Sequence, residues 1–111
     1  DKAIADYKKA IEIKPEYFDA NYNLGAIYYN DGAEIANAAN KLPISATKEY
    51  DAAQKKFKEK MAEAQPFLEA ALAANPTDGN TLLTLKELYA KTNQLDKSAE
   101  MKKRYEALGQ K

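Results

Sequence analysis

The sequence of 111 residues predicts an all-α fold of about five helices. Apolar residues recur at three- and four-residue steps along nearly the whole chain, which is the spacing of one helix face. No run of alternating Val, Ile or Thr between turns predicts a strand. The chain also overlays on itself after a shift of 61 residues, which indicates an internal repeat. We therefore expect a single helical-repeat domain over residues 1–111.

The first predicted helix carries an apolar stripe of Ile4, Tyr7 and Ile11 and ends at Lys14. Pro15 ends it because the residue before a proline avoids the α region. A second helix begins near Phe18. The proline also sets the turn to the next repeat.

The internal repeat is defined by a pattern of residue types. The identical pairs are Ala3 and Ala64, Ala10 and Ala71, Pro15 and Pro76, Leu24 and Leu85, and Tyr28 and Tyr89. This order of small, large, proline, leucine and tyrosine residues resembles the signature of the tetratricopeptide-repeat (TPR) family. The closest match runs from Ala20 to Gly32.

The resemblance implies an α-α superhelix, a TPR-like solenoid of paired helices. In such a fold Gly25 would let neighbouring helices approach closely, and Tyr28 would fill the space beside them. Residues 1–15 then correspond to the second helix of a truncated repeat, residues 16–76 to one repeat, and residues 77–109 to a terminal repeat. The matching first helix of the truncated repeat would precede Asp1. Because the chain starts with Asp1 and not with Met, we expect a processed or trimmed N-terminus.

The central repeat is longer than the family pattern. A TPR has a period of about 34 residues, and the spacing of 61 residues here leaves an excess of 27 at about residues 33–61. The stripe continues through Ile35, Ala38 or Ala39, and Leu42 before Pro43 breaks it. A new stripe then runs through Tyr50, Ala53, Phe57, Met61, Ala64 and Leu68. The sequence therefore predicts one extended antiparallel helical hairpin.

Two local features of this hairpin are predicted from side-chain chemistry. Ser45 or Thr47 is expected to cap the new helix, with Glu49 supporting the cap. Pro66 either kinks one long helix or begins a fresh one, and the kink is the favoured interpretation.

The terminal repeat is predicted at Asn80 to Thr92 and Leu95 to Leu108, with a turn at Asn93-Gln94. Lys86 and Ser98 replace the small residues of the family pattern there. This polar drift is typical of a terminal helix, whose outer face meets water.

Composition excludes several classes of function. The chain has no His and no Cys, so the usual catalytic bases, nucleophiles and metal ligands are missing. We expect no enzyme activity, no catalytic residues, no cofactor and no metal.

The charge balance of the chain bears on its possible partners. The 17 basic and 17 acidic residues balance, which argues against nucleic-acid binding. No apolar stretch is long enough for membrane insertion. The lysine run at Lys55, Lys56, Lys58 and Lys60 is expected to be solvated. A soluble protein of the cytoplasm or the periplasm fits this composition equally well.

The resemblance implies a protein or peptide partner on the concave surface made by the first helix of each repeat. The residues expected there are Tyr22, Asn23, Ala26, Tyr29 and Asn30, followed in the next repeat by Leu83, Thr84 and Glu87. Tyrosine and asparagine together offer apolar area and hydrogen-bonding tips. In the alternative interpretation the tyrosines pack on the neighbouring hairpin. Only Asn23 matches the residues with which some family members clamp a C-terminal carboxylate, so that ligand is not expected.

The alternative function is structural assembly or oligomerisation. The projecting hairpin from Asp31 to Ala64 would self-associate or dock on a partner, or the N-terminal helix would form a homodimer through an exposed face. The hairpin loses this surface if its stripe of Tyr50, Phe57 and Met61 is covered by Ile35, Ala38 and Leu42.

Overall fold

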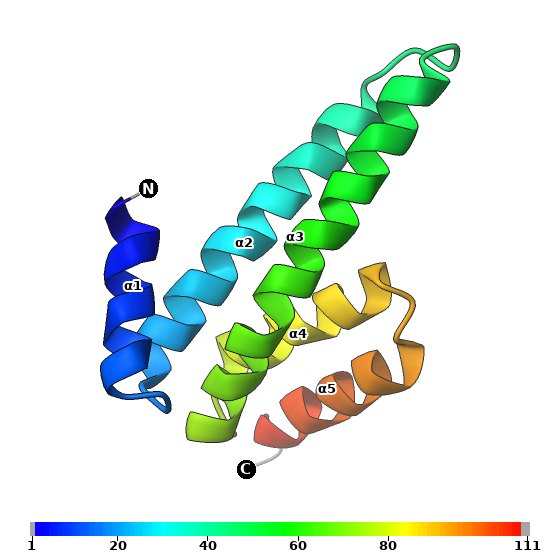
Figure 1. Cartoon of the computed structure of the whole chain (residues 1–111). Coiled ribbons are helices and arrows are strands. Elements are labelled where there is room, and N and C mark those ends of the chain that lie inside the picture. Colours follow the sequence, from blue (N-terminus) through cyan, green and yellow to red (C-terminus); the bar gives the residue numbers. More distant parts are fainter. Residues whose placement is uncertain (1, 110–111) are drawn as a thin grey trace.

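The computed structural model describes residues 2–109, which form five α-helices and no strand (Figure 1). The helices are α1 Lys2–Ile13, α2 Phe18–Asn40, α3 Thr47–Ala74, α4 Gly79–Lys91 and α5 Leu95–Leu108. The prediction of an all-α fold with about five helices is confirmed. Asp1 and residues 110–111, which belong to the predicted domain, lie outside the described residues.

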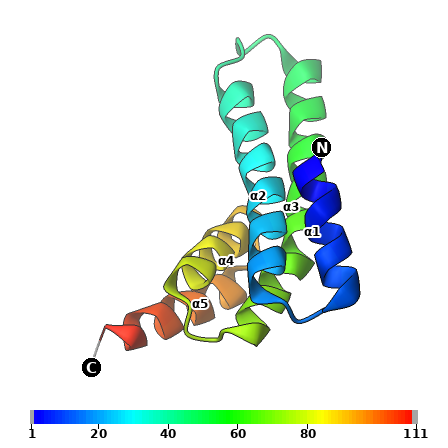
Figure 2. The same cartoon turned by 90° about the vertical axis from the view of Figure 1, so that its left-hand side faces the viewer.

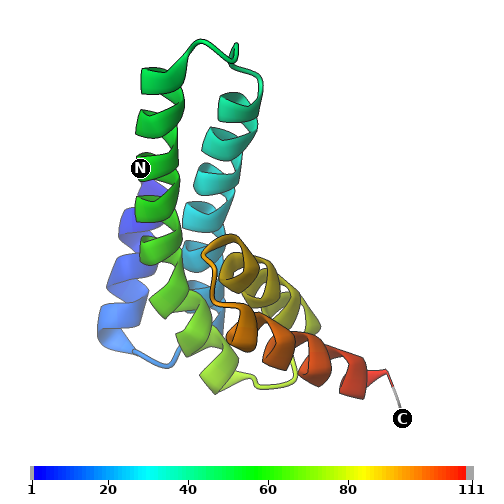
Figure 3. The ribbon, with the colours of Figure 1, turned by 90° about the vertical axis from the view of Figure 1, so that its right-hand side faces the viewer.

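The helices α2 and α3 form one long antiparallel hairpin that projects beyond the other three helices (Figure 1). The predicted extended hairpin is therefore confirmed. The shorter hairpin of α4 and α5 packs against its base, and α1 packs against α2. Figures 2 and 3 show opposite faces of the molecule: α2 and α4 lie on the first, and α3 and α5 lie on the second.

A continuous apolar core follows the α2–α3 contact and extends between α4 and α5. Its buried side chains are Leu24, Tyr28, Phe57, Met61, Ala64, Leu68, Leu72, Leu82, Leu85, Leu88, Tyr89 and Met101. Along Leu95–Leu108, Met101 alone is buried, in line with the polar character of that helix. The predicted stripe of α1, Ile4, Tyr7 and Ile11, is half-buried against this core.

Two glycines allow α2 to approach α3 closely. A Cβ atom on Gly25 would lie 2.7 Å from Cγ of Leu68 and 3.2 Å from its backbone nitrogen. A Cβ atom on Gly32, two helical turns further on, would overlap the terminal methyl group of Met61. The role expected for Gly25 is therefore confirmed. Gly32 has the same role, which sequence analysis did not assign to it.

The turn between α1 and α2 is held by a buried amide. The Nδ2 atom of Asn21 donates to the carbonyl oxygens of Pro15 and Tyr17, both at 2.9 Å. Asn21 is 1% exposed, and these bonds satisfy the amide where water cannot reach it. Sequence analysis missed this residue.

The start of α3 differs from the prediction. Its N-cap is Ala46, and no side chain accepts a hydrogen bond there. The Oγ1 atom of Thr47 instead donates to the Ser45 carbonyl oxygen at 3.4 Å. The cap expected at Ser45 or Thr47 is wrong because the turn after Pro43 places the first helical residue at Thr47 itself, where a side chain no longer reaches the free N–H groups of the first turn.

Pro66 lies inside a helix that is continuous from Thr47 to Ala74. The alternative in which a fresh helix begins at Pro66 is therefore wrong. Proline cannot donate the backbone hydrogen bond of its position. The buried residues Met61, Ala64 and Leu68 continue one apolar stripe across it, and this packing keeps the helix in one piece.

The terminal hairpin is fixed by two side-chain contacts. Asp78 caps α4 because its Oδ2 atom accepts from the backbone nitrogen of Thr81 at 2.9 Å and from the Thr81 hydroxyl at 2.7 Å. The hydroxyl of Ser98 donates to the Lys86 carbonyl oxygen at 2.8 Å. Ser98, where the family pattern has an alanine, thus forms a hydrogen bond between α5 and the backbone of α4.

The glycine contact predicts a clear effect on stability. We expect Gly25→Ala to lower the free energy of unfolding by about 1–3 kcal/mol, because overpacking against Leu68 outweighs a helix-propensity gain of about 1 kcal/mol. The measurement is urea denaturation followed by circular dichroism. The control is Gly79→Ala, where the new Cβ atom would lie 3.4 Å from Tyr105, an ordinary contact. Equal stability losses in both variants would contradict the interpretation.

The capping pattern gives a second prediction. Asp78→Ala should reduce stability by about 1 kcal/mol, because the first turn of α4 loses its acceptor. Thr47→Ala should change it by less than about 0.5 kcal/mol, since Thr47 is exposed and caps no helix. The same denaturation experiment compares the two, and a larger loss at Thr47 would show that its side chain does support α3.

Candidate partner-binding surface

The residues predicted for the concave groove lie on α2 and α4, which share one face of the molecule (Figure 2). Asn30 and Glu87 are exposed there. The other predicted residues are half-buried: Tyr22, Asn23, Ala26, Tyr29, Leu83 and Thr84. The face therefore combines partly covered apolar side chains with accessible polar ones.

A hydrogen bond connects the two helices across this face. The hydroxyl of Tyr29 donates to Oε2 of Glu87 at 3.2 Å. Burial of the phenol, followed by the negative charge of Glu87 and this hydrogen bond, raises the pKa of Tyr29 from 10.0 to about 12. Near neutral pH the hydroxyl therefore keeps its proton and remains a donor. The structure thus brings together two predicted residues that lie 58 positions apart.

Other predicted residues make local contacts. The ring of Tyr22 stacks on that of Phe18, with 5.8 Å between the centroids and 13° between the planes. The hydroxyl of Thr84 donates to the carbonyl oxygen of Asn80 at 2.8 Å. Tyr22 and Tyr29 also pack against the core, so one side of each ring is committed to folding. The exposed edge of this surface includes the amide of Asn30 and the carboxylate of Glu87.

A polar network that sequence analysis missed lies where α3 meets the α4–α5 hairpin. The hydroxyl of Tyr89 and Nε2 of Gln65 both donate to Oε2 of Glu69, the second at 3.1 Å. Nε2 of Gln94 donates to Oε1 of Gln65 at 3.0 Å and to the hydroxyl oxygen of Thr92 at 2.7 Å. Burial, together with the Glu69 carboxylate, raises the pKa of Tyr89 above its usual value. These bonds join α3 to the turn between α4 and α5.

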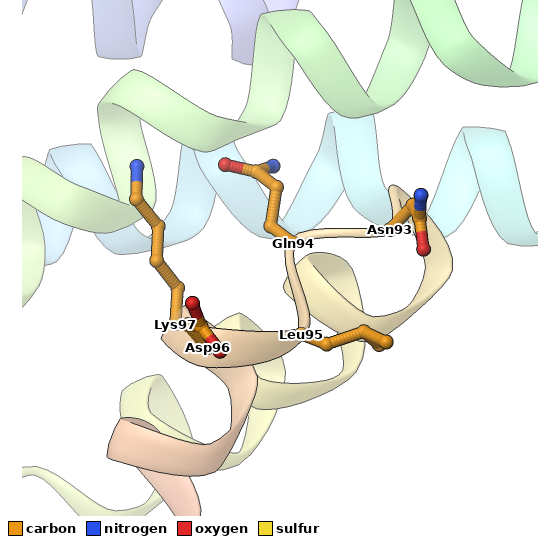
Figure 4. Close-up of a pocket in the computed structure, with 5 residues that line it drawn as sticks. All are labelled: Asn93, Gln94, Leu95, Asp96 and Lys97. Atoms are coloured by element: carbon orange, nitrogen blue, oxygen red, sulfur yellow. The ribbon is translucent and has the colours of Figure 1, made fainter.

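Two hollows adjoin this turn. A cavity of about 460 Å³ lies between α3 and the turn, and its lining residues are Lys58, Ala62, Gln65, Lys91, Thr92, Asn93 and Gln94. A second, of about 480 Å³, is lined by residues 93–97. Figure 4 shows the Gln94 side chain pointing toward α3 and that of Leu95 pointing away from it. Gln94 thus forms a wall shared by both hollows.

The tip of the long hairpin retains a small apolar surface. Phe57 and Met61 are 7% and 0% exposed, so the predicted stripe is largely covered within the hairpin. Ile44 is fully exposed and Tyr50 is 39% exposed. Both line a cavity of about 340 Å³ formed around the loop that follows α2. The tip is therefore what remains of the surface expected for assembly through the hairpin.

Two features are absent from the described residues. Among residues 2–109, acidic side chains form no cluster of three or more that could hold a metal ion. Over the same range, no helix combines the length and apolarity needed to cross a bilayer.

Antiparallel helix pairs packed side by side define an α-helical repeat scaffold of the solenoid class. Comparison with protein families gives the particular family. A TPR repeat model matches residues 1–32, and a tetratricopeptide repeat model matches residues 58–110. The chain belongs to the tetratricopeptide-repeat family. Repeats of this family generally mediate protein–protein interaction and are typically non-catalytic.

The two matches leave out residues 33–57, which form the outer part of the long hairpin. No curated protein and no solved structure matches the chain. The stretch between the two matches is thus one continuous segment at the outer end of α2 and α3.

The contact between Tyr29 and Glu87 yields a titration prediction. Glu87→Gln should lower the pKa of Tyr29 from about 12 toward 10.0, because it removes a negative charge beside the phenol while the burial remains. Phenolate absorbance against pH, with Tyr29→Phe to identify the transition, measures the change. Because the folded-state pKa is raised, the stabilisation is complete below pH 10 and is lost as the pH rises through about 12. Glu106→Gln, on the exposed side of α5, should leave the titration unchanged.

Proposed function

We propose that this chain is a non-catalytic scaffold that binds a peptide or protein segment across α2 and α4. The observation that carries the proposal is the hydrogen bond from Tyr29 to Glu87, which links α2 to α4 on one face. A fixed surface loses little conformational freedom when a partner binds. The family membership supports the same role.

The chemistry of this face suits an extended peptide. Tyr22 and Tyr29 offer partly exposed rings, which give apolar contact at low entropic cost because a tyrosine has few rotatable bonds. Asn23 and Asn30 carry amides that both donate and accept hydrogen bonds, as a peptide backbone requires. Glu87 adds one negative charge at the edge, which favours a partner with a nearby basic residue.

A second candidate function is assembly through the hairpin tip. The exposed Ile44 favours it, since a fully exposed isoleucine at the end of a projecting hairpin is available for burial. Its apolar area is small because Phe57 and Met61 are already covered. Homodimerisation through α1 has less support, because Ile4, Tyr7 and Ile11 pack toward α2 and the core. Ile13, 77% exposed, is the largest apolar group left there.

The two functions are separated by paired charge insertions. Asn30→Arg combined with Thr84→Arg places two cations on the α2–α4 face, and Ile44→Arg places one on the tip. Partners captured by the wild-type chain from an extract of its source cells are identified by mass spectrometry and re-tested as purified proteins. We expect the double variant to weaken binding at least about tenfold, because two bulky charges enter a partly apolar interface.

The tip variant is the matched control. It should keep the affinity of the wild-type chain and should behave as a monomer like it in light scattering. If Ile44→Arg abolishes binding while Asn30→Arg with Thr84→Arg does not, the hairpin is the binding element. If the wild-type chain alone forms a dimer that Ile44→Arg dissolves, assembly is the function.

A further inference from the structure

The cavity of about 460 Å³ between α3 and the α4–α5 turn has a distinct electrostatic character. Lys58 lies on its α3 wall and Lys91 lies on its α4 wall, and no Asp or Glu is among its lining residues. Both lysines are exposed. Within residues 2–109 the ion pair that forms joins Lys60 to Glu63, and neither cavity lysine takes part in one. Two exposed lysines that form no ion pair therefore border one hollow.

The walls of this cavity are fixed before any ligand arrives. Both polar atoms of the Gln65 amide form hydrogen bonds: Nε2 donates to Glu69, and Oε1 accepts from Gln94. Gln94 is further held by Thr92, and its backbone nitrogen donates to the Tyr89 carbonyl oxygen at 2.7 Å. Asn93 has a φ of 60°, which closes the turn tightly. A ligand would therefore meet a polar surface that needs little rearrangement.

The cavity also offers an acceptor beside its two cations. Ala62 lines the α3 wall, and its carbonyl oxygen lacks the usual helical donor because the residue four positions on is Pro66. A ligand with both carboxylates and N–H groups suits this combination, and an acidic peptide has both. A nucleic acid would match the lysines, but the net charge of the chain is zero, and a polyanion binder needs a basic excess.

We propose that this cavity, which we call the side groove, binds an acidic segment of a partner protein. Lys58 and Lys91 take the carboxylates of that segment, and Gln65 and Gln94 orient it. The side groove lies between α3 and the α4–α5 turn, and Figure 3 shows the ribbon of these elements. The residues that line the side groove differ from those of the α2–α4 face.

The test is a selection of random twelve-residue peptides against the full chain, followed by fluorescence anisotropy with the selected peptides. We expect peptides enriched in Asp and Glu. Lys58→Glu combined with Lys91→Glu should weaken their binding about tenfold or more, because two attractions become two repulsions. The matched control, Lys8→Glu with Lys103→Glu, makes the same change in net charge at exposed positions on α1 and α5 and should alter the affinity less than about twofold.

Each other outcome overturns the proposal. Selection of no peptide, or of peptides without acidic enrichment, removes the ligand class. Equal weakening by the control pair shows a general charge effect. A fluorescein-labelled oligothymidylate serves as the nucleic-acid probe. If it binds as tightly as the peptides and loses binding equally in the Lys58 and Lys91 variant, the side groove is a nucleic-acid site. If the variant with Asn30→Arg and Thr84→Arg no longer binds the acidic peptides while the lysine variant still does, the peptides bind on the α2–α4 face instead.

Discussion

The backbone of α2 lies directly against Leu68 at Gly25 and against Met61 at Gly32. At Gly25 a larger residue would meet the branched side chain and the backbone nitrogen of Leu68 and would push the helices apart, whereas at Gly32 it would displace the terminal methyl group of Met61. Because both glycines lie on one side of α2, the close contact runs along two turns of the hairpin and the large side chains of α3 fill it. Helices α1 and α4 pack against this pair and α5 packs on α4, so their positions depend on how closely α2 and α3 approach.

Polar contacts then fix the terminal hairpin from both sides. On one face Tyr29 reaches from α2 to Glu87 of α4. On the other, Gln65 of α3 is bound to Gln94 of the α4–α5 turn. These hydrogen bonds join particular atoms and so add specificity to the apolar packing of Leu82, Leu85 and Leu88 on α4. These two contacts also define the two candidate binding surfaces, so the same bonds serve the fold and the sites.

The sequence predicted the helices well because each has a local cause. Pro15 and Pro76 end helices, and three- and four-residue stripes mark the buried faces. The cap at Ser45 or Thr47 failed, because several residues in that loop are capable of capping and the path of the chain after Pro43 decides among them. The buried role of Asn21 was not predicted, because an asparagine within a helical pattern is usually interpreted as solvated. Its buried role depends on the fold of the preceding turn.

The candidate surfaces were predicted unequally. The α2–α4 residues were named through the family resemblance, but the pairing of Tyr29 with Glu87 was not. The hydrogen bond between Gln65 and Gln94 could not be predicted, because no motif or spacing in the sequence relates these two positions. By itself the sequence determined the number of helices, their approximate ends, the long hairpin and the glycine at its close contact, because these follow from periodicity, proline and side-chain size. Only the tertiary structure decided which residues of α3 face the α4–α5 turn, and thus the side groove, because helical spacing gives a face but not its partner.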